Sequence, residues 1–264
     1  MKTVFIDQLN RKVEINFPPK RIISLVPSQT ELLYDLGLDD EVVGQTIFCI
    51  HPYDKHQSKP RIGGTKKLNL DKIAELKPDL IIGNKEENDQ SQIEALMKLY
   101  PVWMSDIKML DDALNMIERV GELVNKKDDA LKISIEIKNS FTQLTHHLSP
   151  KTPQSLYLIW REPYMAAGKN TFIDDMLKRC GFKNVVEESR YPEISVNTLQ
   201  LLNPELILLS SEPYPFKQKH IDELQSSCPN SKIMLVDGEL FSWYGSRLLK
   251  SVSYFKSLVS SLEF

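Results

Sequence analysis

The sequence predicts an α/β protein in which two Rossmann-like lobes with parallel sheets are joined by one long bridging α-helix. The first observation is a repeated phrase, LKPDLII at 76–82 and LNPELIL at 202–208, which follows an amphipathic helical stretch in both places. Proline disfavours the helical conformation of the residue before it, so each phrase indicates a helix that stops before a buried parallel strand. The second observation is the length of 264 residues, which exceeds the needs of one ordinary domain. We therefore expect two similar lobes with a ligand-binding cleft between them.

The third observation is the stretch 110–148, which contains no proline and a single glycine. Apolar residues recur in it at helical spacing on either side of a polar break at 126–129, which predicts two helices. The second helix, of about 20 residues, would extend about 30 Å and would connect the lobes. The predicted domains are an N-terminal lobe at 1–107, a helical linker at 108–148 and a C-terminal lobe at 149–264.

Within the N-terminal lobe, a hairpin is expected to precede the parallel strands. Ser28 and Glu31 have the spacing of a capping box, which predicts a helix that starts at Ser28 and ends at Gly37. The stretch 47–65 has no regular pattern, and loops of this length are uncommon unless they are functional. The expected strands lie at 4–6, 12–15, 21–26, 42–44 and 80–82.

The C-terminal lobe repeats this order of strand, loop and helix. Thr171 can cap a helix that ends at Gly181, after a loop at 161–170. The expected strands lie at 155–160, 185–186, 206–210 and 233–236, and the expected helices at 171–177, 195–202, 219–225 and from about 246 onward.

Composition excludes several classes of protein. Apolar residues make up 41% and charged residues 26% of the chain, which describes an ordinary globular protein. The net charge of −3 does not favour nucleic acid, and no apolar run approaches a membrane span. Residues 1–7 show no secretory signal, so the chain as written is expected to be cytoplasmic unless a signal was removed. Cys49, Cys180 and Cys228 show no paired spacing, so we expect neither a disulfide framework nor a zinc site, and we expect Cys180 to be buried.

Several of these motifs occur together in one known family. The run RKV at 11–13, the run PKRIISLVPS at 19–28 with Thr30 and Glu31, and NLDKI at 69–73 before the first repeated phrase resemble class III substrate-binding proteins of ABC transporters. These are the helical-backbone receptors for cobalamin, iron–siderophore complexes and haem, and the chain is most similar to the cobalamin-binding branch. The resemblance covers nearly the whole chain. It implies a cleft at the carboxyl ends of the strands, no catalysed reaction, no intrinsic cofactor, and a ligand that carries cobalt or iron.

In the C-terminal lobe, aromatic and arginine side chains directly follow two of the predicted strands. The loop at 239–247 could stack on a flat macrocycle and contact its carboxylate or phosphate; alternatively, its aromatic rings fill the space beneath the last helix. After the strand at 155–160, Arg161 either contacts the ligand or pairs with an acid such as Glu162. Arg190 either contacts the ligand's edge or is solvated. The predicted ligand contacts of this lobe are Trp160, Arg161, Tyr164, Arg190, Tyr191, Phe241, Trp243, Tyr244 and Arg247.

In the N-terminal lobe, His51 is either an axial ligand to cobalt or iron, which imidazole suits, or a hydrogen-bonded loop residue. Ser28 either caps its helix or helps to bind an anionic substituent. The other histidines show no metal-site spacing: His146 and His147 are adjacent, and His56 and His220 are expected to face solvent. The predicted ligand contacts of this lobe are Pro27, Ser28, Phe48, Gly64 and Thr65.

The resemblance also implies a protein partner. In the family, an acidic residue on each lobe docks onto arginines of the membrane permease. Asp71 matches one position, whereas the other is the uncharged Asn197, with Glu193 nearby. Glu86 and Glu87 offer alternative acidic contacts. The predicted partners are therefore a small metal chelate and an ABC permease, with no nucleic acid, and the protein is expected to be monomeric.

Two alternatives use the same fold. One is a cytoplasmic carrier or sensor of a corrinoid or haem, and the other is a metal-dependent enzyme. Against the enzyme, the sequence has no Cys-x-x-Cys motif, no glycine-rich phosphate loop and no cluster of histidine with carboxylates.

Overall fold

Two compact units make up the chain in the computed structural model, which describes residues 1–145 and 151–262. Unit 1 comprises Met1–Ile107, Asp111–Lys138 and Trp243–Arg247, and unit 2 comprises Lys108–Leu110, Asn139–Ser242 and Leu248–Phe264. Each unit has its own sheet with parallel strands, so the predicted two-lobed α/β fold is confirmed. Trp243–Arg247 belongs to unit 1 although it lies near the end of the chain, which the linear order of the sequence did not predict.

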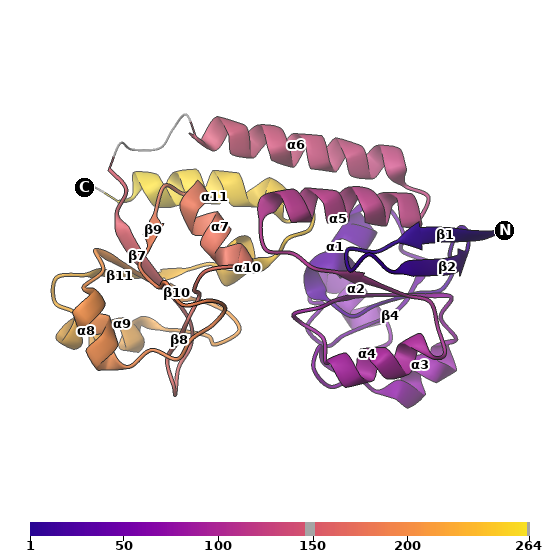
Figure 1. Ribbon diagram of the computed structural model, residues 1–264, viewed down its shortest axis with the longest axis horizontal. Helices are drawn as coiled ribbons and strands as arrows, with labels where there is room; N and C mark the ends of the chain where they lie inside the picture. Colours follow the sequence, from indigo (N-terminus) through magenta and orange to yellow (C-terminus); the bar gives the residue numbers. More distant parts are fainter. Residues whose placement is uncertain (146–150, 263–264) are drawn as a thin grey trace. The chain divides into compact units, whose positions relative to one another are not determined.

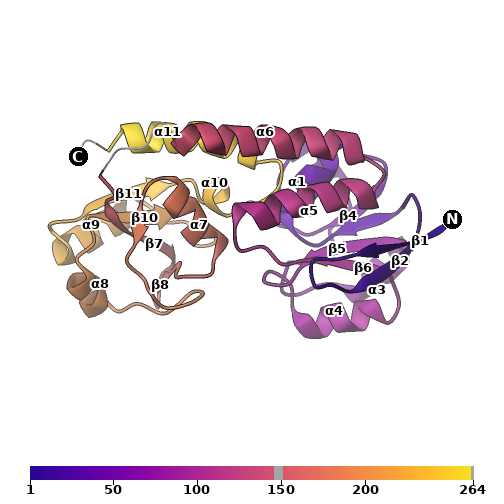
Figure 2. The same ribbon diagram turned by 45° about the horizontal axis from the view of Figure 1, so that its top comes forward.

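The sheet of unit 1 is parallel throughout, with strand order β4-β3-β5-β6. All five residues of β5 are buried, as expected for a parallel strand covered on both faces. Figure 2 shows α1 and α5 on one face of this sheet and α3 and α4 on the other. The strands are β3 (Ile22–Ser24), β4 (Val42–Gln45), β5 (Leu80–Asn84) and β6 (Val102–Ser105), with the predicted hairpin formed by β1 (Lys2–Ile6) and β2 (Lys12–Asn16). The helices are α1 (Pro27–Asp35), α2 (Tyr53–Ser58), α3 (Leu70–Leu76), α4 (Gln90–Met97) and α5 (Leu110–Leu123).

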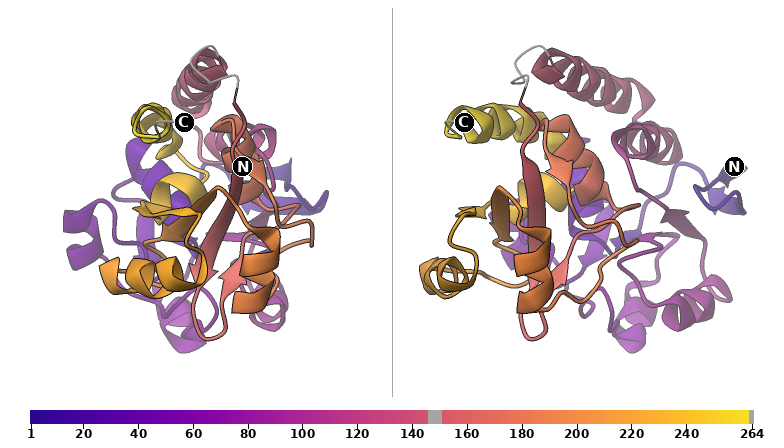
Figure 3. Two further views of the ribbon diagram at one scale, coloured as in Figure 1. Left: turned by 90° about the vertical axis from the view of Figure 1, so that its left-hand side faces the viewer. Right: turned by 60° about the vertical axis from the view of Figure 1, so that its left-hand side comes forward.

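The sheet of unit 2 is built around β7, which pairs in parallel with β10, and β10 pairs in parallel with β11. On the other edge of β7, β9 runs parallel to its start and β8 runs antiparallel to its end. Figure 3 shows α8 and α9 (orange) on the opposite side of the strands from α11 (yellow). The strands are β7 (Gln154–Trp160), β8 (Met165–Ala166), β9 (Lys183–Asn184), β10 (Leu206–Ser210) and β11 (Lys232–Val236). The helices are α7 (Phe172–Arg179), α8 (Val196–Leu202), α9 (Gln218–Ser227), α10 (Gly238–Ser242) and α11 (Leu248–Ser260).

The predicted bridging helix is α6, Lys127–Thr145, which runs without interruption in Figure 1. Its 19 residues correspond to about 30 Å of helix. Residues of α6 up to Lys138 belong to unit 1 and those from Asn139 belong to unit 2. The last residues of the predicted linker, His146, His147 and Leu148, lie outside the described residues.

The repeated phrase has the same structure in both units. Lys77 and Asn203 end α3 and α8 in the left-handed conformation, with φ of 45° and 41°, and a proline follows each. The acid of each phrase then binds the backbone at the start of the neighbouring strand. Asp79 accepts from the backbone N–H groups of Lys20 and Arg21 at 2.8 Å each. Glu205 accepts from the backbone N–H of Gln154 at 2.9 Å.

Some local predictions were wrong. The helix predicted to start at Ser28 with a capping box begins at Pro27 instead, with Val26 as a cap that makes no side-chain hydrogen bond. The strand expected at 185–186 lies two residues earlier as β9, the loop at 239–247 begins inside helix α10, and the last helix starts at Leu248. The strand β6 and the helices α2 and α4 had not been predicted.

The cysteines behave as the sequence indicates. Cys49, Cys180 and Cys228 are all buried and free. Burial raises the pKa of the Cys49 thiol to about 11, so it stays neutral at physiological pH. Within residues 1–145 and 151–262, no helix combines the length and apolar character needed to cross a membrane.

Candidate functional site

The loop that follows β4 exposes an apolar surface at the carboxyl edge of the unit 1 sheet. In this β4 loop (residues 46–52), Ile47, Phe48 and Ile50 are 45%, 52% and 40% exposed. Large apolar side chains that stay exposed together on a folded surface often mark a binding site. The carboxyl ends of parallel strands are also where open α/β sheets bind ligands.

Buried polar contacts hold the β4 loop in this conformation. The Cys49 sulfur lies 3.1 Å from the hydroxyl oxygens of both Thr30 and Thr46. The Gln45 side-chain amide donates to the carbonyl oxygen of Cys49 at 3.2 Å, and its own oxygen accepts from the Tyr34 hydroxyl at 2.6 Å. Because Cys49 is anchored inward, its neighbours Phe48 and Ile50 project outward.

Gly64, predicted with Thr65 at the rim of the site, lies against the same loop. A Cβ at Gly64 would come within 3.0 Å of the Phe48 ring, so the ring packs directly on the glycine backbone. The carbonyl oxygen of Thr65 accepts from the Asn88 side chain at 3.0 Å. Gly64 and Phe48 therefore lie together although they are distant in the sequence, and contact of Phe48, Gly64 and Thr65 with a ligand stays a prediction.

The 243–247 segment (Trp243–Arg247) brings two further predicted residues to unit 1. The rings of Trp243 and His51 meet edge to face, with centroids 5.5 Å apart. The Tyr244 hydroxyl donates to the carboxylate of Glu87. Asn84, at the end of β5, accepts from the backbone N–H groups of Glu86 and Glu87 and so orients this turn. Burial, together with the charge of Glu87, raises the pKa of Tyr244, so its phenol remains protonated and donates.

Arg247, predicted to contact the ligand, is buried in an ion pair. Its guanidinium forms a bidentate ion pair with Glu31, with Nε–Oε2 and Nη2–Oε1 distances of 2.8 and 2.7 Å. The side chains of Arg247 and Glu31 are only 8% and 7% exposed. The guanidinium carbon also lies 4.7 Å from the centroid of the Trp243 ring. The prediction that Arg247 contacts a ligand is therefore corrected: its charge is already matched by a buried carboxylate.

Pro27 and Ser28 lie at the start of α1 beside the 243–247 segment. A Cβ at Gly245 would collide with the carbonyl oxygen of Ser28, so the two backbones are in close contact. The Ser28 side chain is 2% exposed. Ser28 does not cap α1, because the helix starts one residue earlier.

In unit 2, Trp160 and its neighbours lie at the carboxyl end of β7. Trp160 is 40% exposed, and its ring meets that of Tyr214 edge to face at 5.7 Å. Arg161 forms ion pairs with Glu162 at 2.9 Å and with Glu223 at 2.8 Å. The alternative that Arg161 pairs structurally is therefore what the structure shows. Tyr164 is half-buried against the hydrophobic core of the unit.

The remaining unit 2 candidates separate into core and surface. Phe241 is completely buried, and its ring packs on Tyr157 and Phe255 at 5.2 and 4.7 Å. The prediction that Phe241 contacts a ligand is corrected, because the side chain has no exposed surface. Arg190 is exposed, with its guanidinium carbon 5.8 Å from the Tyr191 ring centroid.

The histidines differ from one another. His220, expected to face solvent, is 1% exposed, and its Nδ1 accepts from the backbone N–H of Lys217 at 2.9 Å. Burial lowers the pKa of His220, and the positive charge of Arg161 adds to this effect. His51 is half-buried beside Trp243. Among the described residues, no group of three or more His, Cys, Asp or Glu side chains could hold a metal ion.

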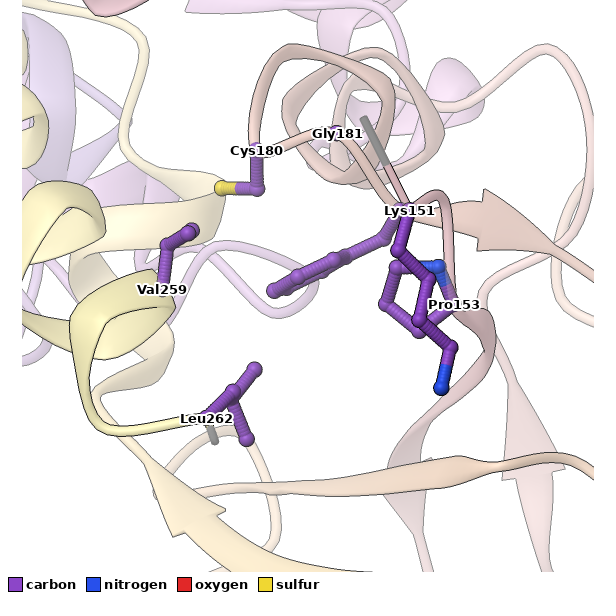
Figure 4. A pocket seen from close by; sticks show the side chains of 7 residues that line it. Lys151, Pro153, Cys180, Gly181, Val259 and Leu262 are labelled. Carbon is purple, nitrogen blue, oxygen red and sulfur yellow. The ribbon is translucent and has the colours of Figure 1, made fainter. Parts of the chain in front are cut away.

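A small cavity in unit 2 lies away from these residues. Its volume is about 110 Å³, and in Figure 4 Val259 and Leu262 face Pro153 and Lys151 across it, with Cys180 at its edge. Pockets for small-molecule ligands usually measure about 300–1,000 Å³. The cavity also adjoins the amino end of β7, opposite the carboxyl end that carries Trp160. We therefore do not assign it as the ligand site.

The predicted docking acids are surface residues. Asp71 lies in the first turn of α3, and Asn197 occupies the equivalent place in α8. Asp71, Asn197 and Glu193 are all exposed. Glu87, named as an alternative docking acid, instead accepts the hydrogen bond from Tyr244.

Comparison with known proteins assigns the class. Residues 22–230 match the family described as periplasmic binding protein, and the chain belongs to this family. It is 27% identical over 196 residues to the vitamin B12-binding protein of Photorhabdus laumondii, covering 73% of this chain and 71% of that protein. It is 27% identical over 262 residues to the ABC transporter substrate-binding lipoprotein YvrC of Bacillus subtilis, covering 93% and 82% of the two chains.

The fold agrees with this assignment. The periplasmic heme-binding protein RhuT from Roseiflexus superposes with a TM-score of 0.81 at 18% identity, covering 92% of this chain and 98% of that one. The family is extracytoplasmic, and its members are binding proteins. The chain is accordingly a binding protein, and the enzyme alternative is set aside.

Three residues important in this arrangement were missed or misread from the sequence. Glu31 was interpreted as part of a capping box, Glu87 as a surface acid, and Tyr214 was not singled out. Each is defined by a partner distant in the chain: Arg247 for Glu31, Tyr244 for Glu87, and Trp160 for Tyr214. No local pattern signals such partners, although an acid in the middle of an otherwise buried helix is an indication that a cation lies nearby.

Proposed function

We propose that the protein binds a metal-chelate small molecule, a corrinoid such as cobalamin, and delivers it to an ABC importer. The observation that carries this proposal is the exposed apolar β4 loop beside the His51–Trp243 ring pair in unit 1. A relative named for vitamin B12 binding supports the choice of a corrinoid, and the lipoprotein relative supports a role with an ABC transporter.

The chemistry of these groups suits a large, flat, partly apolar ligand. Phe48 and Ile50 offer exposed apolar surface, and aromatic rings stack favourably on a conjugated macrocycle. In unit 2, Trp160 offers a second exposed ring at the end of a strand. The ligand, rather than the protein, would supply the cobalt or iron.

A titration tests the ligand class. Cyanocobalamin, dicyanocobinamide, haem and a ferric siderophore would each be added to the purified protein in a calorimeter. We expect micromolar or tighter binding of the corrinoids and about tenfold weaker binding after Phe48→Ala, equivalent to about 1.4 kcal/mol. Tyr53→Ala is the control, because Tyr53 is 73% exposed on the neighbouring α2. Absence of binding to all four compounds would refute the proposal. Tighter binding of haem than of the corrinoids would identify haem as the ligand instead.

His51 is proposed as an axial ligand to the metal of the bound chelate. An imidazole that replaces water on cobalt changes the visible absorption spectrum of aquocobalamin. We expect this change on binding to the wild-type protein and not to His51→Ala. Dicyanocobinamide, whose axial positions carry cyanide, serves as the control ligand. An identical spectrum with both proteins would exclude axial coordination by His51.

Asp71 and Glu193 are proposed to dock onto basic residues of the permease. The test is pull-down of the cognate permease by the Asp71→Arg and Glu193→Arg variants. Glu75→Arg is the control, because Glu75 is also an exposed acid of α3. Weaker capture by the first two only would support transport. Ligand binding without any permease capture would instead favour the carrier or sensor alternative.

A further inference from the structure

We propose that Arg247 and Glu31 are positioning residues, which hold the buried ring of Trp243 in place as the support for His51, the residue proposed to meet the ligand. The proposal rests on the proposed function only in its ligand-binding readout. It assigns to the buried ion pair a role in the site rather than a contact with the ligand.

Side-chain contacts anchor the 243–247 segment in unit 1. It lies between α10 and α11, and the residues on either side of it, Ser242 and Leu248, belong to unit 2. The segment thus enters unit 1 as a short connection that pairs with no strand. Its anchors in unit 1 include the hydrogen bond from Tyr244 to Glu87 and the ion pair of Arg247 with Glu31.

Arg247 acts on Trp243 directly. Its planar guanidinium is fixed by two hydrogen bonds to Glu31 and covers the Trp243 ring at 4.7 Å. The same ring meets His51 at 5.5 Å. The ring therefore contacts both the fixed guanidinium and the histidine, so its plane is set before any ligand arrives.

Lysine would not reproduce this arrangement. A guanidinium presents a rigid fork that matches a carboxylate and stacks on an aromatic face, whereas an ammonium group is a point charge on a flexible stem. Arg247→Lys keeps the buried charge that Glu31 requires but loses the fork and the stacked plane. It therefore separates positioning from simple charge neutralisation.

The first experiment needs no ligand. The protein would be labelled with 5-fluorotryptophan, which reports Trp103, Trp160 and Trp243 as separate ¹⁹F resonances, and Trp243→Phe would assign the third. We expect Arg247→Lys and Glu31→Gln each to shift or broaden the Trp243 resonance and leave the other two unchanged. Arg179→Lys is the matched control, because Arg179 also pairs with a carboxylate, Asp175, and lies 5.8 Å from a ring, Phe141, in unit 2.

The second experiment is a double-mutant cycle with cyanocobalamin as the probe. We expect Arg247→Lys to raise its Kd about fivefold in the wild-type background, in keeping with the usual strength of an aromatic contact. In a Trp243→Leu background the same substitution should change Kd less than twofold, because Arg247 acts through the ring. Arg179→Lys should leave Kd unchanged in both backgrounds.

The outcomes are distinguishable. An unchanged Trp243 resonance in both folded variants would overturn the positioning role, as would a full fivefold effect of Arg247→Lys in the Trp243→Leu background. If the wild-type protein binds no cyanocobalamin, the proposed corrinoid function fails, while the ¹⁹F spectra still decide whether Arg247 and Glu31 position the ring.

Discussion

Position 245 illustrates how a single residue limits the packing of the 243–247 segment. Gly245 lies against the carbonyl oxygen of Ser28, and a Cβ there would collide with it. The obstacle is backbone, which cannot rotate away as a flexible side chain could. The close approach of the segment to the start of α1 therefore requires glycine.

Gly245→Ala should lower the free energy of unfolding by about 2 kcal/mol, because overpacking against a fixed group forces the backbone to move. Urea unfolding would measure the loss. Ser246→Ala is the matched control: the Ser246 hydroxyl is buried and has no hydrogen-bond partner within residues 1–145 and 151–262, so removing it should be neutral or slightly stabilising. A loss of stability in the control but not in Gly245→Ala would contradict this packing.

His220 should make the stability of the protein depend on pH. Burial lowers the pKa of His220 in the folded state. In the unfolded chain the histidine has its ordinary pKa of about 6.5 and binds a proton below that pH, whereas the buried ring of the folded protein stays neutral to lower pH. The stabilising contribution is complete above that value, and it is lost as the pH falls through it. The free energy of unfolding should therefore fall between pH 7.5 and 5.5.

His220→Asn tests this directly. The asparagine oxygen can replace Nδ1 as the acceptor for the Lys217 N–H, but it does not titrate. We expect urea unfolding of the variant to show a flatter pH dependence than the wild type, by up to about 1.4 kcal/mol for each pKa unit of difference. Equal slopes for the two proteins over this range would show that His220 does not contribute.

At this scale the sequence predicted the kinds of residue in the site better than their roles. Phe241, Trp243 and Tyr244 lie close together in the sequence after β11 and all three are buried, yet Phe241 packs in the core of unit 2 and the other two join unit 1. Local pattern could not separate them, because which side a ring faces depends on where α10 ends and the segment turns. That turn is set by contacts with Glu31 and Glu87, which are distant in the chain.

The helices α3 and α8 show how one motif builds the same element twice. Both have a side-chain cap, from Asn69 and Ser195, and both end in a left-handed residue before proline. Exposed Leu70 and Val196 begin the two helices. The strand after each helix pairs in parallel with the first strand of its unit's sheet.

The acids of the two phrases should each stabilise their unit. Asp79→Ala and Glu205→Ala should each cost about 1 kcal/mol, the usual net value of hydrogen bonds lost from a partly exposed site. Their effects should add, because Asp79 binds the backbone of Lys20 and Arg21 in unit 1 whereas Glu205 binds that of Gln154 in unit 2. Chemical denaturation of the single and double variants would measure this. Glu75→Ala, at an exposed position of α3, should stay within about 0.5 kcal/mol of the wild type, and an equal loss there would contradict a specific role.

Long strands and helices with a clear pattern were predicted well, including β7, β10, α8 and the bridging helix. The short elements were not. The strand β6 and the helix α4 carry weak patterns, and β9 has only two residues, so its position depends on pairing with β7 rather than on its own sequence.

For the whole molecule, one continuous helix belongs to both units. Helix α6 passes from unit 1 to unit 2 between Lys138 and Asn139 without a break. Within unit 2, its Phe141 packs against Phe255 of α11 with ring centroids 6.2 Å apart. A rigid helix at this point makes the connection stiffer than an extended linker of the same length would be.

Lys138→Pro should break this connection. Proline removes a helical hydrogen bond and clashes with the preceding turn, at a cost of about 3 kcal/mol or more. Thermal unfolding and hydrogen exchange across α6 would show a lower melting temperature and lost protection. Lys138→Ala removes the same side chain without bending the helix, so it should keep both near wild type; equal loss in the two variants would mean that the side chain, not helix continuity, matters.

The sequence by itself determined the two-lobed α/β fold, the bridging helix, and most of the side chains at the ends of the strands. These follow from local pattern: apolar periodicity, helix stops at proline, and strand-end loops. Only the tertiary structure decided that Trp243–Arg247 joins unit 1, that Arg247 pairs with Glu31, and that Phe241 is core. The physical reason is that a buried charge needs a counter-charge in contact with it, and the fold decides which residue supplies it. For Arg247 that residue is Glu31, 216 positions away in the sequence.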